Sequence, residues 1–206
     1  VEYGLVPMFP VVGPLRLKPS PFRYPVSQDQ VMDVWQHAAR THGGPMWLGG
    51  ASAGACLAAG VAVRLRDSEG PQPLGLAFLY GLFHGVLPEA SVELRRRLFG
   101  LSDLRVVQEM VRRAAVNYVG SADQLHNPAI FAGLADLHGL PPVHMLNADR
   151  DMLRASAENF ARRLTRAGVP HEGWYLRGTR HGFLSRTDWP AFTAGTKALA
   201  QWLGGS

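Results

Sequence analysis

The chain has 206 residues, of which 47% are hydrophobic and 18% are charged, and its net charge is +5 at pH 7. A chain of this length can form one domain with a real core, and its apolar runs are shorter than the roughly 18–20 residues that span a bilayer. We therefore expect a single cytoplasmic domain over residues 1–206, with neither a membrane span nor a signal peptide.

The basic residues and the cysteine argue against nucleic acid, disulfides and zinc. The arginines at 95–97, 112–113 and 162–163 lie on predicted amphipathic helices without interleaved aromatic residues, a pattern typical of a solvated helix face. Cys56 is the one cysteine, so an internal disulfide and a cysteine-based zinc site are excluded, and we expect its side chain to be buried. Because no His, Asp and Glu residues show ligand spacing, we expect neither a metal nor a cofactor.

Predicted strands and helices alternate along the chain. Residues 10–17 are expected to form a short buried strand before a Pro-rich loop at 18–25. A helix is expected over 26–41, with Ser27 as its N-cap and Gly43-Gly44 as its stop signal. The later elements are a strand at 45–50, an alanine-rich helix after Ser52, a strand at 73–83, one or two helices within 88–116, a loop at 121–142, a strand at 143–149, a helix at 153–168, a strand at 171–176 and a helix at 189–203. This alternation predicts an α/β fold with a mostly parallel sheet and helices on both faces.

Residues 50–54, Gly-Ala-Ser-Ala-Gly, form a G-x-S-x-G sequence between a predicted strand and a predicted helix. In this pattern the serine occupies a strained turn, and Gly50 and Gly54 let the strand and helix backbones pass close together. Ala53, the residue after the serine, would offer its backbone N–H to an oxyanion, assisted by the field of the helix N-terminus. The sequence therefore predicts Ser52 as a nucleophile. A phosphate-binding loop is excluded because no Gly-Lys-Ser/Thr follows, and this segment has no G-x-G-x-x-G.

A serine nucleophile needs a base and an acid that orients the base. Asp151 follows a predicted strand at its C-terminal end, where open α/β sheets build their sites, and His181 lies in a glycine-rich loop after the next strand. Ser52, Asp151 and His181 stand in the order that α/β-hydrolases use. Asp149 is the alternative acid, two residues earlier.

His84 follows the predicted strand at 73–83, and two interpretations of it are open: a residue that lines a binding pocket, or a packing residue. The histidines on predicted helix ends, in loops or at a strand start are interpreted as solvated or packing residues; they are His37, His42, His138 and His171.

Several ordered segments carry a family resemblance. They are "RLKPSPFRYPVSQD" (16–29), "GGASAGACLAA" (49–59), "VNYVGSADQLHNP" (116–128), "LPPVHMLNADRDMLRASAENFARRLTRAGVP" (140–170) and "HGF" (181–183). Together they resemble bacterial esterases of the hormone-sensitive-lipase-like family of α/β-hydrolases. The resemblance covers most of the chain and corresponds to the C-terminal two-thirds of such an esterase.

The resemblance implies a serine carboxylesterase that works through an acyl-enzyme on small esters with short- to medium-chain acyl groups, or on acetyl groups. Ser52 would be the nucleophile and His181 the general base, while the Asp-x-Leu-Arg signature at 151–154 aligns on Asp151 as the orienting acid. Such relatives often dimerise through their last strand and helix. For the segments at 171–176 and 189–203 both alternatives, a homodimer interface and the monomer core, stay open.

The sequence departs from this family in one respect. The family's H-G-G-G-type loop, which supplies most of the oxyanion hole, is absent, and "THGGPMW" (41–47) is interpreted as a helix stop. We expect the chain to begin inside the helix after that loop, without the family's first three strands and cap. Three explanations are open: a fragment of a longer protein, strands supplied by a partner chain, or loss of catalysis. The alternative functions are a catalytically impaired or non-enzymatic small-molecule-binding protein, and a lyase or dehydratase that uses the same pocket.

Overall fold

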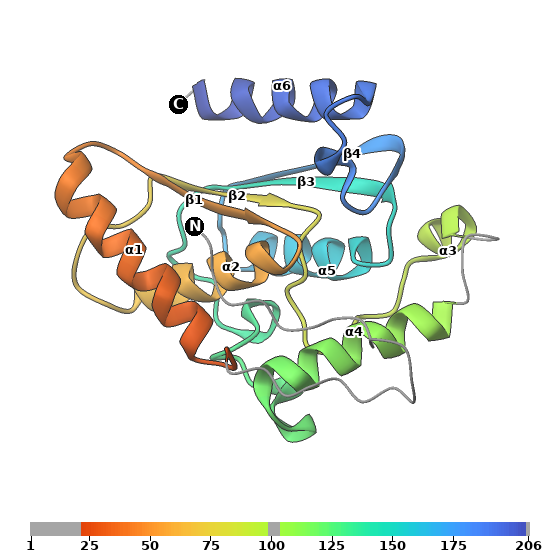
Figure 1. Cartoon of the computed structure of the whole chain (residues 1–206), viewed down its shortest axis with the longest axis horizontal. Helices are drawn as coiled ribbons and strands as arrows, with labels where there is room; N and C mark the ends of the chain where they lie inside the picture. Colours follow the sequence, from red (N-terminus) through yellow and green to blue (C-terminus); the bar gives the residue numbers. More distant parts are fainter. Residues whose placement is uncertain (1–21, 99–103, 205–206) are drawn as a thin grey trace.

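A computed structural model describes residues 22–98 and 104–204, which form a parallel sheet between layers of helices (Figure 1). The strands are β1 (Trp47–Ala51), β2 (Gly75–Leu79), β3 (Val143–Arg150) and β4 (His171–Arg180), in the order β1-β2-β3-β4. Helices α2 (Ala53–Arg66) and α5 (Arg154–Arg166) lie on one face, and α6 (Pro190–Gly204) lies on the other. All three strand pairs are parallel, which confirms the predicted fold class.

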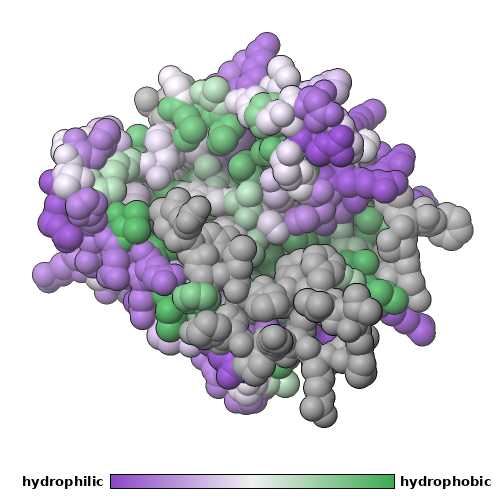
Figure 2. Space-filling view, viewed as in Figure 1, coloured by the Kyte–Doolittle hydropathy of each residue, from purple (hydrophilic) through white to green (hydrophobic). Residues whose placement is uncertain are grey.

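The remaining elements surround this layered centre. Helix α1 (Val26–His42) packs against α2, and Figure 2 shows hydrophilic residues over the outer side of α1, at the left of the view. Between β2 and β3 the chain forms α3 (Val92–Leu98), α4 (Leu104–Val119) and the 3-10 helices η1 (Ala122–His126) and η2 (Ala132–Leu134). A further 3-10 helix, η3 (Phe183–Ser185), follows β4. Of the one or two helices predicted within 88–116, the described residues form two, and the second of them continues to Val119.

The ends of α1 follow from local chemistry. Gly43 adopts a left-handed backbone with φ 68° just past the helix, which confirms the predicted stop signal. The prediction of Ser27 as the N-cap is wrong, because Pro25 occupies the cap position. Ser27 lies within the first turn, is buried, and donates its hydroxyl to the carbonyl of Phe22 at 3.1 Å.

The main core lies between the sheet and helices α2 and α5. Phe83 stacks on Phe160 with ring centroids 4.2 Å apart, and Phe78 meets both rings edge-on. Cys56 is buried as predicted, and burial raises the pKa of its thiol to about 12, so it is a packing residue with little thiolate character. The core thus holds the carboxyl ends of the strands in fixed positions.

Other boundaries differ from the sequence-based expectations. The predicted strand at 10–17 and most of the predicted loop at 18–25 lie outside the described residues. Strand β4 continues to Arg180, four residues past its predicted end, and the predicted loop at 121–142 contains two 3-10 helices. The extension of β4 matters for the site, since it delivers the loop that carries His181.

Candidate active site

Ser52 occupies a strained turn between β1 and α2. Its backbone has φ 55° and ψ −117°, a conformation that costs a non-glycine residue on the order of 1–3 kcal/mol. The turn is held on both sides: the N–H of Ser52 donates to the carbonyl of Leu79 on β2 at 2.9 Å, and the carbonyl of Ser52 accepts from the N–H of Ala55 at 3.1 Å. This geometry lifts the serine side chain out of the sheet edge, as the G-x-S-x-G sequence predicts.

Gly50 permits the close approach of strand and helix at this turn. A Cβ built on Gly50 would collide with the carbonyl group of Gly54 and would lie 2.8 Å from the N of Ala55. The two glycines predicted as part of the site thus act on the backbone of the turn, by letting β1 and the first turn of α2 touch.

We expect Gly50→Ala to lower the free energy of unfolding by about 1–3 kcal/mol, because backbone atoms must shift to admit the methyl group. Urea-induced unfolding measures this change. Gly173→Ala is the matched control, since the nearest atom that its Cβ would meet is the Cε of Met145, at 3.7 Å. Equal losses in the two variants would contradict the account of a tight strand-to-helix turn.

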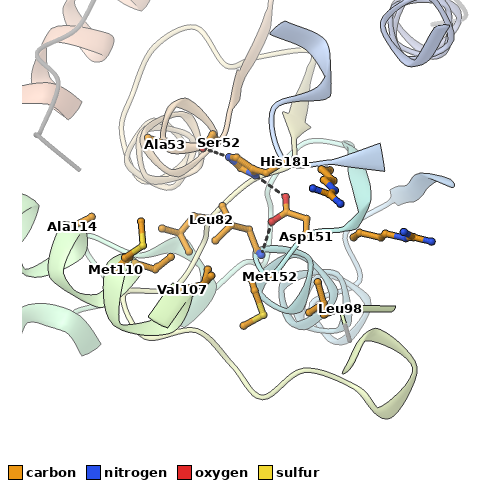
Figure 3. A pocket seen from close by; sticks show the side chains of 14 residues that line it. Ser52, Ala53, Leu82, Leu98, Val107, Met110, Ala114, Asp151, Met152 and His181 are labelled. Carbon is orange, nitrogen blue, oxygen red and sulfur yellow. Dashed lines mark hydrogen bonds and ion pairs between the residues drawn. The ribbon is translucent and has the colours of Figure 1, made fainter. Parts of the chain in front are cut away.

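Ser52, His181 and Asp151 form a continuous chain of hydrogen bonds, seen in line in Figure 3. The Oγ of Ser52 lies 2.8 Å from the Nε2 of His181, and the Nδ1 of His181 lies 2.6 Å from the Oδ2 of Asp151. The other carboxylate oxygen of Asp151 accepts from the N–H of Leu153 at 2.9 Å. The side chain of Asp151 is 5% exposed and that of His181 is 40% exposed, so the acid is enclosed while the imidazole faces the pocket.

Asp149, the alternative acid, has different partners. Its buried carboxylate accepts from the N–H of Gly178 at 2.8 Å and from the Nη1 of Arg97 at 3.1 Å. The Nη1 of Arg154 reaches its backbone carbonyl at 3.1 Å. Asp149 therefore ties α3 and α5 to the strand ends, and the structure brings Asp151, not Asp149, to His181.

The serine opens into a pocket of about 340 Å³. Figure 3 shows Leu82, Val107 and Met110 on one side of the hydrogen-bonded residues Ser52, His181 and Asp151. Met152 and Leu98 also line the pocket. The described residues that line it are Ser52, Ala53, Leu82, Leu98, Val107, Met110, Val111, Ala114, Arg150, Asp151, Met152, Leu153, Arg180 and His181. Most of this wall is apolar, so the pocket suits a hydrocarbon group next to the serine.

Ala53 is the first residue of α2 and lines the pocket beside Ser52. Amides in the first turn of a helix have no partner within the helix, so this N–H is available to an anion near the serine. The backbone N–H groups of Gly43-Gly44 are not available to such an anion, because the five-residue strand β1 separates them from Ser52 by roughly 16 Å. The interpretation of "THGGPMW" (41–47) as a helix stop is confirmed, because α1 ends at His42 and Gly43 occupies its C-cap.

His84 is not among the residues that line this pocket. Of the two interpretations of His84, a pocket-lining residue and a packing residue, the structure favours the packing residue and not the predicted binding role. Its side chain is buried, and its Nδ1 lies 2.8 Å from the Oγ of Ser156 on α5. Ser156 also accepts from the N–H of Phe83 at 2.9 Å, so His84 and Ser156 together fix the chain after β2. Because the neighbouring residues are apolar and pack into the core, the side chain of His84 is buried with them and does not face the site.

Burial of His84 predicts a loss of stability in acid. Desolvation lowers the pKa of His84 from 6.5 to about 4, so the folded protein holds the neutral form while the unfolded chain protonates first. The free energy of unfolding therefore keeps its full value, as far as His84 is concerned, above pH 6.5. It falls by about 3 kcal/mol in total as the pH drops toward 4. Unfolding free energies measured between pH 4 and 7 should show this slope for the wild type and a shallower slope for His84→Gln. Parallel pH profiles of the two proteins would contradict it.

Tyr80 contacts the triad and was missed by the sequence reasoning. Its ring meets the ring of His181 edge-on at 5.1 Å and that of Phe183 at 5.4 Å. Burial, with a smaller effect of the nearby charge of Asp151, raises the pKa of Tyr80, so the phenol stays neutral. Its place directly after β2, at the carboxyl end of a parallel strand, was the available signal.

Within residues 22–98 and 104–204, no group of three His, Cys, Asp or Glu side chains could hold a metal ion. None of the helices in this part of the chain is long and apolar enough to cross a membrane. Three of the four histidines interpreted as solvated or packing residues are exposed; His171 at the start of β4 is half-buried.

The arrangement has the nucleophile, base and acid that acyl transfer to a serine requires. A serine hydroxyl at hydrogen-bond distance from an imidazole can lose its proton to it, and a buried carboxylate on the other ring nitrogen favours the protonated imidazole that results. The apolar pocket holds an organic group next to the nucleophile.

The fold and the site define the class of protein. A family model described as the alpha/beta hydrolase fold matches residues 16–185, which is most of the chain, and the chain therefore belongs to that family.

Solved structures share this fold with the chain. It is similar to a hormone-sensitive lipase from a metagenome library, with a TM-score of 0.79 and 24% identity over 92% of this chain and 63% of that chain. It is also similar to an esterase from the bacterial hormone-sensitive lipase family, with a TM-score of 0.76 and 20% identity over 88% of this chain and 60% of that chain. A thermostable esterase from Pseudomonas putida gives a TM-score of 0.71 and 22% identity over 84% of this chain and 56% of that chain.

These similarities show a common fold, and the chain spans between 56% and 63% of the length of the three structures. A comparison with curated proteins finds no match.

Proposed function

We propose that the chain is a serine carboxylesterase that hydrolyses small esters through an acyl-enzyme. The observation that carries the proposal is the continuous hydrogen-bonded chain from Ser52 through His181 to Asp151 at the wall of an apolar pocket. Membership of the alpha/beta hydrolase fold family and similarity to structures described as esterases support it.

The proposed reaction has two halves. The Oγ of Ser52 attacks the ester carbonyl as the Nε2 of His181 takes its proton, and Asp151 stabilises the imidazolium. The tetrahedral intermediate collapses to an acyl-enzyme, and His181 returns the proton to the departing alcohol. A water that gives its proton to His181 then attacks the acyl carbonyl, releasing the acid and restoring the Ser52 hydroxyl.

The negative charge of the intermediate needs donors beside the serine. We propose the backbone N–H of Ala53 as one donor, with the N-terminus of α2 adding a favourable field. Loss of a single oxyanion donor typically costs about 10²–10³ in kcat, so the activity of this chain measures how completely the charge is stabilised.

The pocket supports short to medium acyl chains. Its volume of about 340 Å³ and its wall from α4 and the chain after β2 suit a hydrocarbon group of a few carbons. For the segments at 171–176 and 189–203 both earlier alternatives, a homodimer interface and the monomer core, stay open; Trp174 and Tyr175 of β4 are exposed. A single catalytic domain over residues 1–206 and a cytoplasmic location stay predictions.

Hydrolysis of p-nitrophenyl butyrate tests the proposal, with Ser52→Ala as the blank. Serine-dependent turnover of a folded preparation is the expected result. A folded chain whose rate equals that of the Ser52→Ala variant would contradict the esterase proposal and favour the alternative, a small-molecule-binding protein on the same fold. Circular dichroism of both proteins ensures that folded samples are compared.

A further inference from the structure

Two arginines lie side by side at the wall of the serine pocket. Arg150 ends β3 and Arg180 ends β4, and the two are direct partners across the parallel strand pair. Both are exposed, and both line the pocket together with Ser52 and His181. The sequence reasoning assigned a role to neither.

The acidic residues at this edge of the sheet are bound to other groups. Asp149 is held by Arg97 at 3.1 Å, and Glu93 accepts from Arg97 at 2.9 Å and from Arg154 at 2.8 Å. The carboxylate of Asp151 uses one oxygen for His181, and the other accepts from a backbone N–H. Each carboxylate therefore has its partners without Arg150 or Arg180.

Within the part of the chain that the structure describes, neither Arg150 nor Arg180 forms an ion pair. Both arginines line the same cavity, and Asp151, the one carboxylate among the described residues of its lining, is enclosed. The opposite wall, from α4 and Leu82, is apolar. The pocket thus combines a hydrocarbon surface on one side with an uncompensated positive edge on the other, and such an edge attracts anions.

We propose that Arg150 and Arg180 bind a carboxylate of the substrate, so that the preferred esters carry a free carboxylate in addition to the ester bond. Guanidinium groups recognise carboxylates through paired N–H donors, and two of them on neighbouring strands can hold one carboxylate between them. This inference rests on the proposed esterase function, since it names the class of ester that the same site takes. The carboxylate belongs either to the acyl part or to the alcohol part, and the experiment separates the two.

The kinetic test uses matched pairs of esters. Mono-p-nitrophenyl glutarate is compared with p-nitrophenyl butyrate for a carboxylate on the acyl part, and 4-butyryloxybenzoate with phenyl butyrate for one on the alcohol part. At least one anionic ester should show the higher kcat/KM, and added salt should reduce that advantage. In Arg150→Gln and Arg180→Gln the anionic-to-neutral ratio of kcat/KM should fall about tenfold or more, the effect of losing a charge-assisted hydrogen bond.

Arg177→Gln is the matched control, because Arg177 is an exposed arginine of the same strand that does not line this pocket. It should leave the ratio unchanged. Equal ratios in the wild type and the Arg150→Gln and Arg180→Gln variants, or an equal fall in the Arg177→Gln variant, would overturn the proposal.

A binding measurement keeps this inference separate from the esterase proposal. Glutaric acid mono-p-nitroanilide is an amide analogue of the acyl-side ester, and 4-butyramidobenzoate is that of the alcohol-side ester. Calorimetry should give a dissociation constant for one of them that rises about tenfold or more in Arg150→Gln and Arg180→Gln, and not in Arg177→Gln. This result in a chain without turnover would sustain the carboxylate site while the esterase proposal fails. Binding of neither analogue, or binding that none of the substitutions weakens, would overturn the carboxylate site itself.

Discussion

His181→Ala is expected to lower kcat for p-nitrophenyl butyrate by about 10⁵–10⁶, close to the loss caused by Ser52→Ala. The nucleophile and its base act as one unit, so removal of either abolishes nearly the whole contribution of the pair. The 2.8 Å contact between the Oγ of Ser52 and the Nε2 of His181 is the structural basis of this expectation. Initial rates measured at equal concentrations of folded wild-type and variant protein provide the test.

Two controls sharpen this result. His37→Ala removes an exposed imidazole from α1 and should leave kcat unchanged. Added imidazole should restore part of the rate of His181→Ala, because a free base can enter the open pocket, and should not rescue Ser52→Ala. A His181→Ala variant with near wild-type turnover would contradict the assignment of His181 as the base.

Asp151→Asn is expected to lower kcat by about 10⁴ while the protein stays folded. A neutral amide cannot stabilise the imidazolium, and it can hold the ring in the wrong tautomer, which removes the acceptor that Ser52 needs. We expect this loss at Asp151 because its Oδ2 lies 2.6 Å from the Nδ1 of His181. Both kcat and the free energy of unfolding are measured.

Asp149→Asn is the contrasting variant. It weakens the ion pairs of a buried carboxylate with Arg97 and Arg154, so we expect a loss of up to about 3–5 kcal/mol of stability. The fraction that remains folded should keep most of its kcat. The reverse pattern, with activity lost at Asp149 and retained at Asp151, would overturn the choice between the two acids.

The order of elements could be predicted because their patterns are local. The apolar run before Ser52, the alanine-rich segment after it and the amphipathic pattern after Asp151 can each be recognised within a few residues of sequence. Parallel strands bring their carboxyl ends to one edge, so the positions of Ser52, Asp151 and His181 just after three strands were enough to expect them together. The family resemblance added the choice between the two aspartates.

The pocket wall could not be predicted in the same way. Val107 and Met110 reach the site from α4, whose sequence has only an amphipathic pattern that any surface helix would show. The interpretation of His84 as a binding residue failed because a residue a few positions past a strand end can turn into the core, as His84 does toward Ser156.

The positive edge of the pocket depends on contacts between distant segments. Arg150 and Arg180 look like ordinary surface arginines until strand register makes them neighbours. Only the contacts of Asp149 and Glu93 reveal that the nearby acids are bound to other arginines.

Reaction with diethyl p-nitrophenyl phosphate, followed by intact mass and peptide mapping, is the most direct test of the claim that Ser52 is a nucleophile activated by His181. The account predicts one covalent adduct, located on Ser52, whose formation is lost in Ser52→Ala and strongly slowed in His181→Ala. A folded chain that forms no adduct, or one that reacts at Ser52 equally fast in His181→Ala, would contradict the account.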